Sequence, residues 1–152
     1  TQVSWDQGTI SRKRSKTQSH KGVPTVTYKL WPETIGLLKE FRSNADVVLL
    51  NQNGSRLLVD GVDSSGHYTK SDNIKSAYSR LLQKLSFSKP FKLLRKTSAT
   101  LINSDERFRG LDQLFLGHAP ATMAEKHYTV ASRSALDDAL SYLRNAYGLG
   151  DD

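Results

Sequence analysis

Residues 91–128 contain side chains that could bind a phosphate group, donate a proton and act as a nucleophile. Lys92 and Arg95 lie three residues apart, a spacing that puts them on one side of a helix. His118 follows a glycine after a short apolar segment, and Tyr128 comes ten residues after that histidine. A rigidly held guanidinium can direct two donors at the non-bridging oxygens of a phosphate. The set predicts phosphate chemistry if the fold brings these groups together.

The apolar pattern around Arg95 predicts a central helix over residues 91–103. Its inward face would consist of Leu94, Ser98, Leu101 and Ile102. Lys92, Arg95 and Ala99 would form the neighbouring face, so that Arg95 lies at the edge of the core. The alternative is an ordinary surface helix of a basic protein, in which these two cations have no special function.

Tyr128 is the candidate nucleophile, because it lies in a polar context, Lys-His-Tyr-Thr, where a core tyrosine would have apolar neighbours. A phenol has a pKa near 10, and populating its anion at neutral pH costs about 4 kcal/mol. It therefore needs nearby cations or a base, and Arg95, Lys92 and His118 are the candidates. His118 could donate a hydrogen bond to a phosphate oxygen or to a local carbonyl group. His127 is interpreted as a packing or DNA-contacting residue.

The composition restricts the kinds of site that the chain could hold. It has no cysteine, which excludes disulfides and thiolate chemistry and fits a reducing compartment. The four histidines have no recognisable metal-ligand spacing, so no metal is expected. No run approaches the roughly 18 apolar residues of a membrane span, and no secretory signal precedes the fold. The first residue is Thr rather than Met, so the chain could be a piece of a longer protein.

The excess of basic residues indicates a polyanionic partner. Lys and Arg total 22 against 15 acidic residues, which gives a net charge of +7. Residues 1–30 include only one acid, Asp6, and their cations are Arg12, Lys13, Arg14, Lys16, Lys21 and Lys29. This concentration favours a surface that binds phosphates, although the cations of a solvated turn would look the same.

The elements around these residues predict an α+β fold, mainly α-helical, in one domain of 152 residues. A small antiparallel β-hairpin is expected at the N-terminus from residues 8–11 and 23–28, with a basic loop at 12–22. A second hairpin is expected around Asn53-Gly54, with strands at 47–50 and 56–59. The segment 60–70 is interpreted as a loop.

Several helices are predicted besides the central one. Pro32 is expected to open a helix with an apolar stripe of Ile35, Leu38 and Phe41. Ser71 is expected to cap a helix whose stripe is Ile74, Ala77, Tyr78, Leu81, Leu82 and Leu85. A short helix over 111–116 would end at Gly117, and Thr122 and Glu125 form a capping box before Tyr128. A final helix from Ser134 would carry Leu136, Ala139, Leu140, Leu143 and Tyr147.

Four motifs, in order along the chain, resemble those of the tyrosine recombinases, the family of phage integrases and their relatives. They are Ser15-Lys16-Thr17 in the hairpin loop, Lys92-x-x-Arg95, Leu116-Gly117-His118, and Tyr128. The segment Leu30-Trp31-Pro32-Glu33 also looks like the start of the helix that follows the hairpin in the family. The resemblance implies a DNA breaking–rejoining catalytic-domain fold, of which residues 1–152 would be the C-terminal part.

The resemblance also implies an activity, site-specific DNA recombination. Tyr128 would attack a DNA phosphodiester, forming a 3′-phosphotyrosine and releasing a 5′-hydroxyl. Arg95 would stabilise the charge at the phosphorus, Lys16 would protonate the leaving oxygen, and His118 would hydrogen-bond the scissile phosphate. Lys92 stands where the family commonly has histidine. No metal or nucleotide cofactor is implied.

The partner implied by the resemblance is double-stranded DNA, on which the protein would assemble as a homo-tetramer. The residues expected to contact DNA are Arg12, Lys13, Arg14, Lys21 and Lys96. The expected location is the cytoplasm, either at a prokaryotic nucleoid or as the product of a phage or another mobile element. The final helix could pack onto a neighbouring protomer, as in relatives, or onto its own core.

The chain departs from the family pattern in two places. The family has another catalytic arginine upstream of the hairpin, and neither Arg12 nor Arg14 is at that position. Many relatives place the tyrosine nine residues after the histidine, where this chain has His127. The alternatives are therefore an integrase fragment that binds DNA without cutting it, a type IB topoisomerase with the same chemistry, and a basic protein without a nucleic-acid role.

Overall fold

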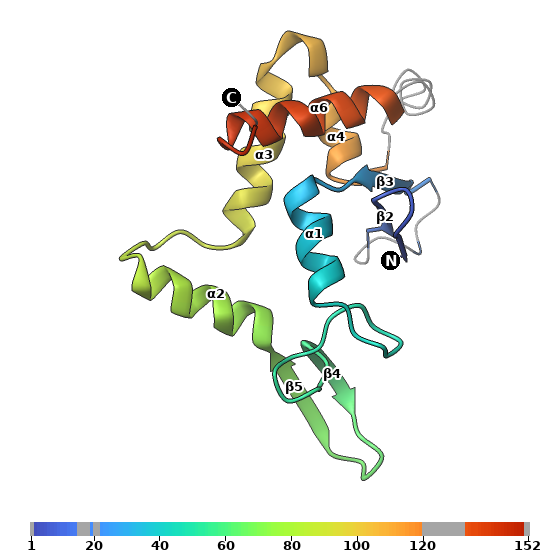
Figure 1. Cartoon of the computed structure of the whole chain (residues 1–152), viewed down its shortest axis with the longest axis vertical. Helices are drawn as coiled ribbons and strands as arrows, with labels where there is room; N and C mark the ends of the chain where they lie inside the picture. Colours follow the sequence, from blue (N-terminus) through green and yellow to red (C-terminus); the bar gives the residue numbers. More distant parts are fainter. Residues whose placement is uncertain (1, 15–18, 20–21, 120–132, 151–152) are drawn as a thin grey trace. The chain divides into compact units, whose positions relative to one another are not determined.

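The structure, a computed structural model, describes residues 2–14, 19, 22–119 and 133–150. It forms two compact units (Figure 1). The first unit is built from residues 1–35 and 94–152, and the second from the intervening residues 36–93. The fold is α+β, as predicted, with small antiparallel sheets. Within the described ranges, no helix has both the length and the apolar character needed to cross a lipid bilayer.

The sheet of the first unit consists of three antiparallel strands in the order β1-β2-β3. These strands are β1 at Gln2–Ser4, β2 at Thr9–Lys13 and β3 at Thr25–Lys29. The pair β2–β3 is the predicted hairpin, and its register places Arg12 opposite Val26. Because β2 ends at Lys13 rather than at residue 11, Arg12 and Lys13 extend from a strand and not from a loop. The short strand β1 was not predicted.

The helices of the first unit agree with the prediction to within one residue at each predicted end. They are α1 at Pro32–Glu40, which continues into the second unit, α3 at Lys92–Ser104, α4 at Leu111–Phe115 and α6 at Arg133–Ala146. The proline at the first position of α1 lacks an N–H that the helix would leave unpaired. The glycine after α4 takes a φ of 65° at Gly117, a left-handed conformation that ends the helix.

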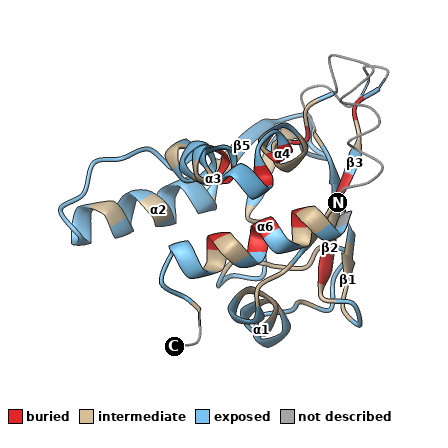
Figure 2. Ribbon diagram, turned by 90° about the horizontal axis from the view of Figure 1, so that it is seen from above, coloured by how far each residue is buried: buried red, intermediate tan, exposed pale blue. Residues whose placement is uncertain are grey.

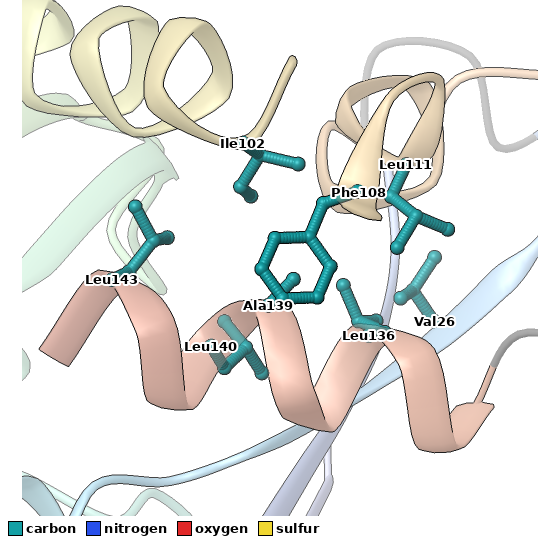
Figure 3. Packing of buried hydrophobic residues seen from close by; sticks show 8 residues of the cluster. All are labelled: Val26, Ile102, Phe108, Leu111, Leu136, Ala139, Leu140 and Leu143. Carbon is teal, nitrogen blue, oxygen red and sulfur yellow. The ribbon is translucent and has the colours of Figure 1, made fainter. Parts of the chain in front are cut away.

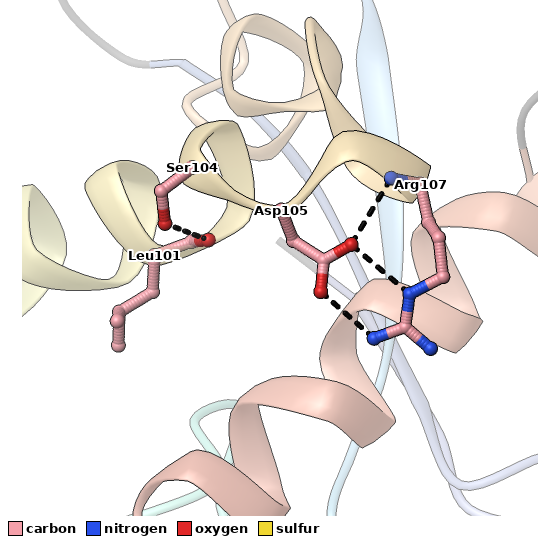
Figure 4. A network of polar contacts seen from close by, with 4 residues as sticks. All are labelled: Leu101, Ser104, Asp105 and Arg107. Atoms are coloured by element: carbon pink, nitrogen blue, oxygen red, sulfur yellow. Dashed lines mark hydrogen bonds and ion pairs between the residues drawn. The ribbon is translucent and has the colours of Figure 1, made fainter.

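A 3-10 helix, η2 at Glu106–Phe108, connects α3 to α4 and was not predicted. Asp105 caps it, because its Oδ1 accepts a hydrogen bond from the backbone nitrogen of Arg107 at 3.0 Å. The same carboxylate binds the guanidinium of Arg107 through Nε at 3.0 Å and Nη2 at 2.8 Å (Figure 4). Beside it, the Ser104 hydroxyl donates to the carbonyl of Leu101 at 2.9 Å. This capped turn directs Phe108 into the core.

The hydrophobic core of the first unit lies against α6 (Figures 2 and 3). Its members are Val26, Ile102, Phe108, Leu111, Leu136, Ala139, Leu140 and Leu143. Each large apolar side chain buried in this way stabilises the fold by about 1.5–3 kcal/mol. The predicted stripe of α6 is confirmed for its four buried members, while Tyr147 lies just beyond the helix and is 37% exposed. Of the two packing alternatives, α6 packs onto its own core.

Polar contacts fix the segment between β3 and α1 onto α6. The indole Nε1 of Trp31 donates to the carbonyl of Leu140 at 2.9 Å. Glu33, in the first turn of α1, forms an ion pair with Arg144 at 2.7 Å. These contacts hold the end of β3 and the start of α1 against α6.

The second unit contains a β-hairpin that lies at a different place from the predicted one. Its strands are β4 at Leu58–Val62 and β5 at Tyr68–Asp72. The prediction of a loop over 60–70 is therefore wrong, and the predicted hairpin around Asn53-Gly54 is reduced to one bridge, Leu50 to Arg56. Asp63 forms the real turn, because its Oδ1 accepts from the backbone nitrogens two and four residues on, each at 2.9 Å. An aspartate whose side chain accepts hydrogen bonds from the backbone a few residues on is a local turn signal.

Helix α2, at Asn73–Lys84, follows β5 in the second unit. Its cap is Asp72, whose side chain accepts from the backbone nitrogen of Lys75 at 2.8 Å, so the prediction of Ser71 is wrong by one residue. No residue of α2 is buried, and Leu81 is 50% exposed. Phe41, expected in the stripe of α1, lies one residue beyond that helix and is 62% exposed. The periodicity of apolar residues does not indicate whether another element covers them.

Candidate anion-binding site

The structure brings four of the predicted site residues together in the first unit. They come from separate segments: Arg12 in β2, Arg14 just after it, Arg95 in the first turns of α3, and His118 after α4. Arg12 and Arg95 are exposed, and Arg14 and His118 are half-buried. We call these four residues the basic cluster.

The end of α4 is the part of the fold to which the cluster is attached. Its turn has two hydrogen bonds, from the nitrogen of Gly117 to Leu114 at 2.8 Å and from the nitrogen of His118 to Gln113 at 3.0 Å. This pattern is a Schellman motif, which requires a residue with positive φ and thereby explains the glycine. A Cβ built on Gly117 would lie 3.8 Å from the Cβ of Arg14, so this turn is close to the residue that follows β2.

Two side chains bind the last carbonyl groups of α4. Arg95 donates from Nη2 to the carbonyl of Leu116. The hydroxyl of Tyr28 donates to the carbonyl of Phe115 at 2.9 Å, and the rings of Tyr28 and Phe115 meet edge to face at 6.3 Å. The helix end carries partial negative charge, which favours a cation there. Arg95 is thereby held by one of its five N–H donors, and the described residues show no hydrogen bond from the other four.

The members of the basic cluster are close enough to affect one another's protonation. Burial, followed by the charges of Arg12 and Arg14, lowers the pKa of Arg95. Burial, followed by the charges of Arg14 and Arg95, lowers the pKa of His118, although Asp112 opposes this shift. Positive charges are therefore concentrated at this point of the first unit.

No carboxylate neutralises the arginines of the cluster within the part of the chain that the structure describes. The ion pairs found there join Arg56 to Asp46, Lys70 to Asp60, Arg107 to Asp105, Arg109 to Glu106, and Arg144 to Glu33. Uncompensated guanidinium groups gathered from distant segments attract anions, and their planar forks match the geometry of phosphate. The basic cluster is therefore a candidate anion-binding site.

The sequence left open whether His118 bonds to a phosphate or to a nearby group of the protein, and the structure shows a nearby partner. Its Nδ1 lies 2.9 Å from Oε1 of Gln113, a side-chain amide rather than a backbone carbonyl. Its Nε2 has no hydrogen-bond partner among the described residues. The second ring nitrogen is thus available to a ligand of the cluster.

The other predicted site residues are not among the four that form the basic cluster, and some of them lie outside the described ranges. Lys92 is the exposed first residue of α3 and belongs to the second unit. Lys13 in β2 and Lys96 in α3 are exposed in the first unit. The remaining ones, Lys16, Lys21 and Tyr128, lie outside the described residues, as does the capping box at Thr122 and Glu125.

Two residues of this site were not singled out in the sequence, Tyr28 and Gln113. The sequence does contain a signal for Gln113. In a Schellman motif that ends at a glycine, the residue after the glycine bonds back to the residue four positions before the glycine, and here these residues are His118 and Gln113. Nothing local to Tyr28 indicates that it reaches α4, 87 positions away.

In the described part of the chain, no group of three or more His, Asp or Glu side chains could hold a metal ion. Comparison with known protein families, with curated protein sequences and with solved structures found no match.

Proposed function

We propose that the chain is a DNA strand-transfer protein of the tyrosine recombinase type, whose basic cluster binds the scissile phosphate. One observation carries this proposal: Arg12, Arg14, Arg95 and His118 gather from distant segments, without a carboxylate partner for the arginines in the described structure. This arrangement also favours the recombinase-like fold that the sequence motifs imply.

The chemistry of a phosphodiester explains why such a cluster would serve catalysis. In the transition state, negative charge spreads over the non-bridging oxygens, and positioned cations stabilise it. Arg95 is anchored to the end of α4, and its donors that have no partner among the described residues would bind these oxygens. Removing one such donor lowers the rate by about 100- to 1000-fold in comparable sites.

The covalent step would follow the resemblance. The hydroxyl oxygen of Tyr128 would attack phosphorus and form the phosphotyrosine bond while the bond to the 5′ oxygen breaks, and the phenolic proton would pass to water. Lys16 protonates that leaving oxygen, and Lys92 supplies a further cation. Rejoining reverses the same steps, so no cofactor is consumed. Assembly as a tetramer on DNA and origin in a mobile element belong to the same proposal.

DNA binding by the cluster is tested with the full chain and a fluorescein-labelled duplex, by anisotropy as a function of salt. Arg14→Ala and Arg95→Ala are each expected to weaken binding and to reduce the slope of log affinity against log salt by about 0.9 per lost phosphate contact. Arg109→Ala is the control, since it removes an exposed arginine of the same unit that is paired with Glu106. Equal losses in all three variants would contradict a specific site.

Cleavage is tested with a pool of nicked duplexes of randomised sequence, from which covalent adducts are isolated under denaturing conditions. Wild-type protein is expected to form an adduct, and Tyr128→Phe to form none while still binding DNA. Adduct formation by Tyr128→Phe would overturn the assignment of the nucleophile. Binding without any wild-type adduct would favour the alternative, a DNA-binding module that does not cut.

A further inference from the structure

Gln113 connects two titratable side chains at the end of α4. Its Oε1 lies 2.9 Å from Nδ1 of His118, and its Nε2 donates to Oδ2 of Asp112 at 2.7 Å. The backbone carbonyl of Gln113 also accepts from the nitrogen of His118 at 3.0 Å. The histidine is therefore held to Gln113 through both its ring and its backbone.

The contact with Asp112 determines which way the amide of Gln113 faces. An ionised carboxylate has only acceptors, so it must meet the NH₂ group of the amide rather than its oxygen. The amide oxygen then faces the imidazole and needs a donor. This donor is the N–H at Nδ1 of His118, which fixes the tautomer of the neutral ring.

We infer that Gln113 is a positioning residue, which keeps the proton of neutral His118 on Nδ1, so that the ring binds a DNA phosphate only after Nε2 is protonated. The inference rests on the proposed function, because it assumes that the basic cluster binds a phosphodiester. It adds that binding takes up a proton.

The two states of the ring present opposite surfaces to the cluster. With its proton on Nδ1, neutral His118 has a lone pair at Nε2, which would face the lone pairs of a phosphate oxygen. The imidazolium has a donor at both nitrogens and keeps its bond to Gln113 while Nε2–H binds the anion. A phosphate therefore favours the imidazolium over the neutral ring.

Among the described residues, the charged and titratable groups around His118 come from several segments. Arg14 after β2 and Arg95 on α3 oppose protonation, and Asp112 on α4 favours it. Tyr28 on β3 reaches the same helix end through its hydroxyl. Burial and the two arginines lower the pKa of His118, so the free site holds mainly the neutral ring at neutral pH. A bound phosphate neutralises part of the arginine charge and allows protonation.

The sign of the pH dependence follows from this linkage. Because the complex binds one more proton than the free protein, affinity for DNA rises as pH falls. The slope of log affinity against pH approaches about one between the pKa of the free ring and that of the bound ring. A DNA phosphodiester does not titrate in this range, so the proton is taken up by the protein.

The test measures duplex affinity from pH 5.5 to 8.5 at constant ionic strength. Wild-type protein is expected to bind up to about tenfold more tightly for each unit by which pH falls. His118→Ala should lose this dependence, which separates His118 from the other histidines. Gln113→Met keeps the length of the side chain but removes the acceptor, so the neutral ring can carry its proton on Nε2 and donate. Its affinity should change little with pH.

A matched control is Gln83→Met, a glutamine in α2 of the second unit, which should keep the wild-type pH profile. Nitrogen NMR of histidine-labelled protein provides a direct measurement. It should show the proton of His118 on Nδ1 in the wild type and mainly on Nε2 in Gln113→Met. A wild-type ring protonated on Nε2, or an unchanged pH profile in Gln113→Met, would overturn the inference.

Failure of this inference differs from failure of the proposed site. If Arg14→Ala and Arg95→Ala weaken binding while the Gln113 and His118 variants keep the wild-type pH profile, the anion site stands and the positioning role fails. If the arginine variants bind DNA like the wild type, the site itself is wrong.

Discussion

The hydroxyl of Tyr28 donates a hydrogen bond to the carbonyl oxygen of Phe115 at 2.9 Å, across 87 positions of the chain. This bond joins β3 to the last turn of α4, next to the carbonyl that Arg95 binds. The sheet thereby supports the end of α4, which is directly followed by Gly117 and His118.

Tyr28→Phe tests this support without changing any charge. Losing the hydrogen bond should lower the free energy of unfolding by about 1 kcal/mol, measured by urea denaturation. DNA affinity should also fall, because the end of α4 would be less firmly placed. Tyr68→Phe is the control, since that hydroxyl donates to exposed Asp60 in the second unit. Unchanged DNA affinity in Tyr28→Phe would show that the bond has no role in the site.

Gly117→Ala tests the backbone conformation that ends α4. The φ of 65° at this position is unfavourable for a residue with a Cβ, so the variant should lose about 1–2 kcal/mol of stability. Gly36→Ala is the matched comparison, because Gly36 lies within α1 at negative φ and an added Cβ meets nothing within 4 Å. Alanine there should stabilise the protein by up to about 1 kcal/mol. Thermal unfolding of both variants measures the difference, and equal shifts would contradict the expectation.

Leu136→Ala tests the core against α6. Leu136 is 2% exposed within the buried cluster, so the truncation should cost about 2–5 kcal/mol in the free energy of unfolding. Leu37→Ala removes the same atoms from a side chain that is 57% exposed and should cost far less. Chemical denaturation gives both values. A similar cost for the two variants would mean that α6 does not cover the core in solution.

Glu33→Gln tests the ion pair between α1 and α6. The hydrogen bond from Arg144 is the main reason that the pKa of Glu33 is lowered. A lowered carboxyl pKa stabilises the fold above the unfolded value, about 4.3 for glutamate, and this contribution disappears as pH falls through the folded pKa. The wild type should therefore be more stable than Glu33→Gln at pH 7, and the difference should shrink as pH falls below the unfolded value and through the folded pKa. A difference that is independent of pH would exclude this origin.

The sequence predicted the α-helices of the first unit well because short-range rules define them. The apolar repeat of α6, the proline of α1 and the glycine after α4 are local features, and each element is found within one residue of its expected end. The second unit was predicted less well. There, Asn53-Gly54 is a stronger hairpin signal than the aspartate turn at Asp63, yet the latter joins the strands.

The candidate site shows the same division between local and distant information. Arg95 and His118 were identifiable from residue type and spacing. Their convergence with Arg12 and Arg14 depends on the register of β2 with β3 and on the contact of Tyr28 with α4. These are long-range contacts that no local pattern encodes. The tautomer of His118 depends in turn on the side-chain amide of Gln113. Its role becomes clear only from its two contacts, with Asp112 and with the imidazole.

The interleaved order of the two units has a consequence for synthesis on the ribosome. Residues 36–93 emerge as a continuous stretch, whereas the sheet at residues 2–29 belongs to a unit that is completed only when residues 94–152 have been synthesised. Until α6 emerges, Trp31 lacks its acceptor on Leu140, 109 positions downstream, and Val26 remains open to solvent. Closing so long a loop slows folding. The N-terminal hairpin is therefore expected to reach its packed state only after most of the chain has been synthesised.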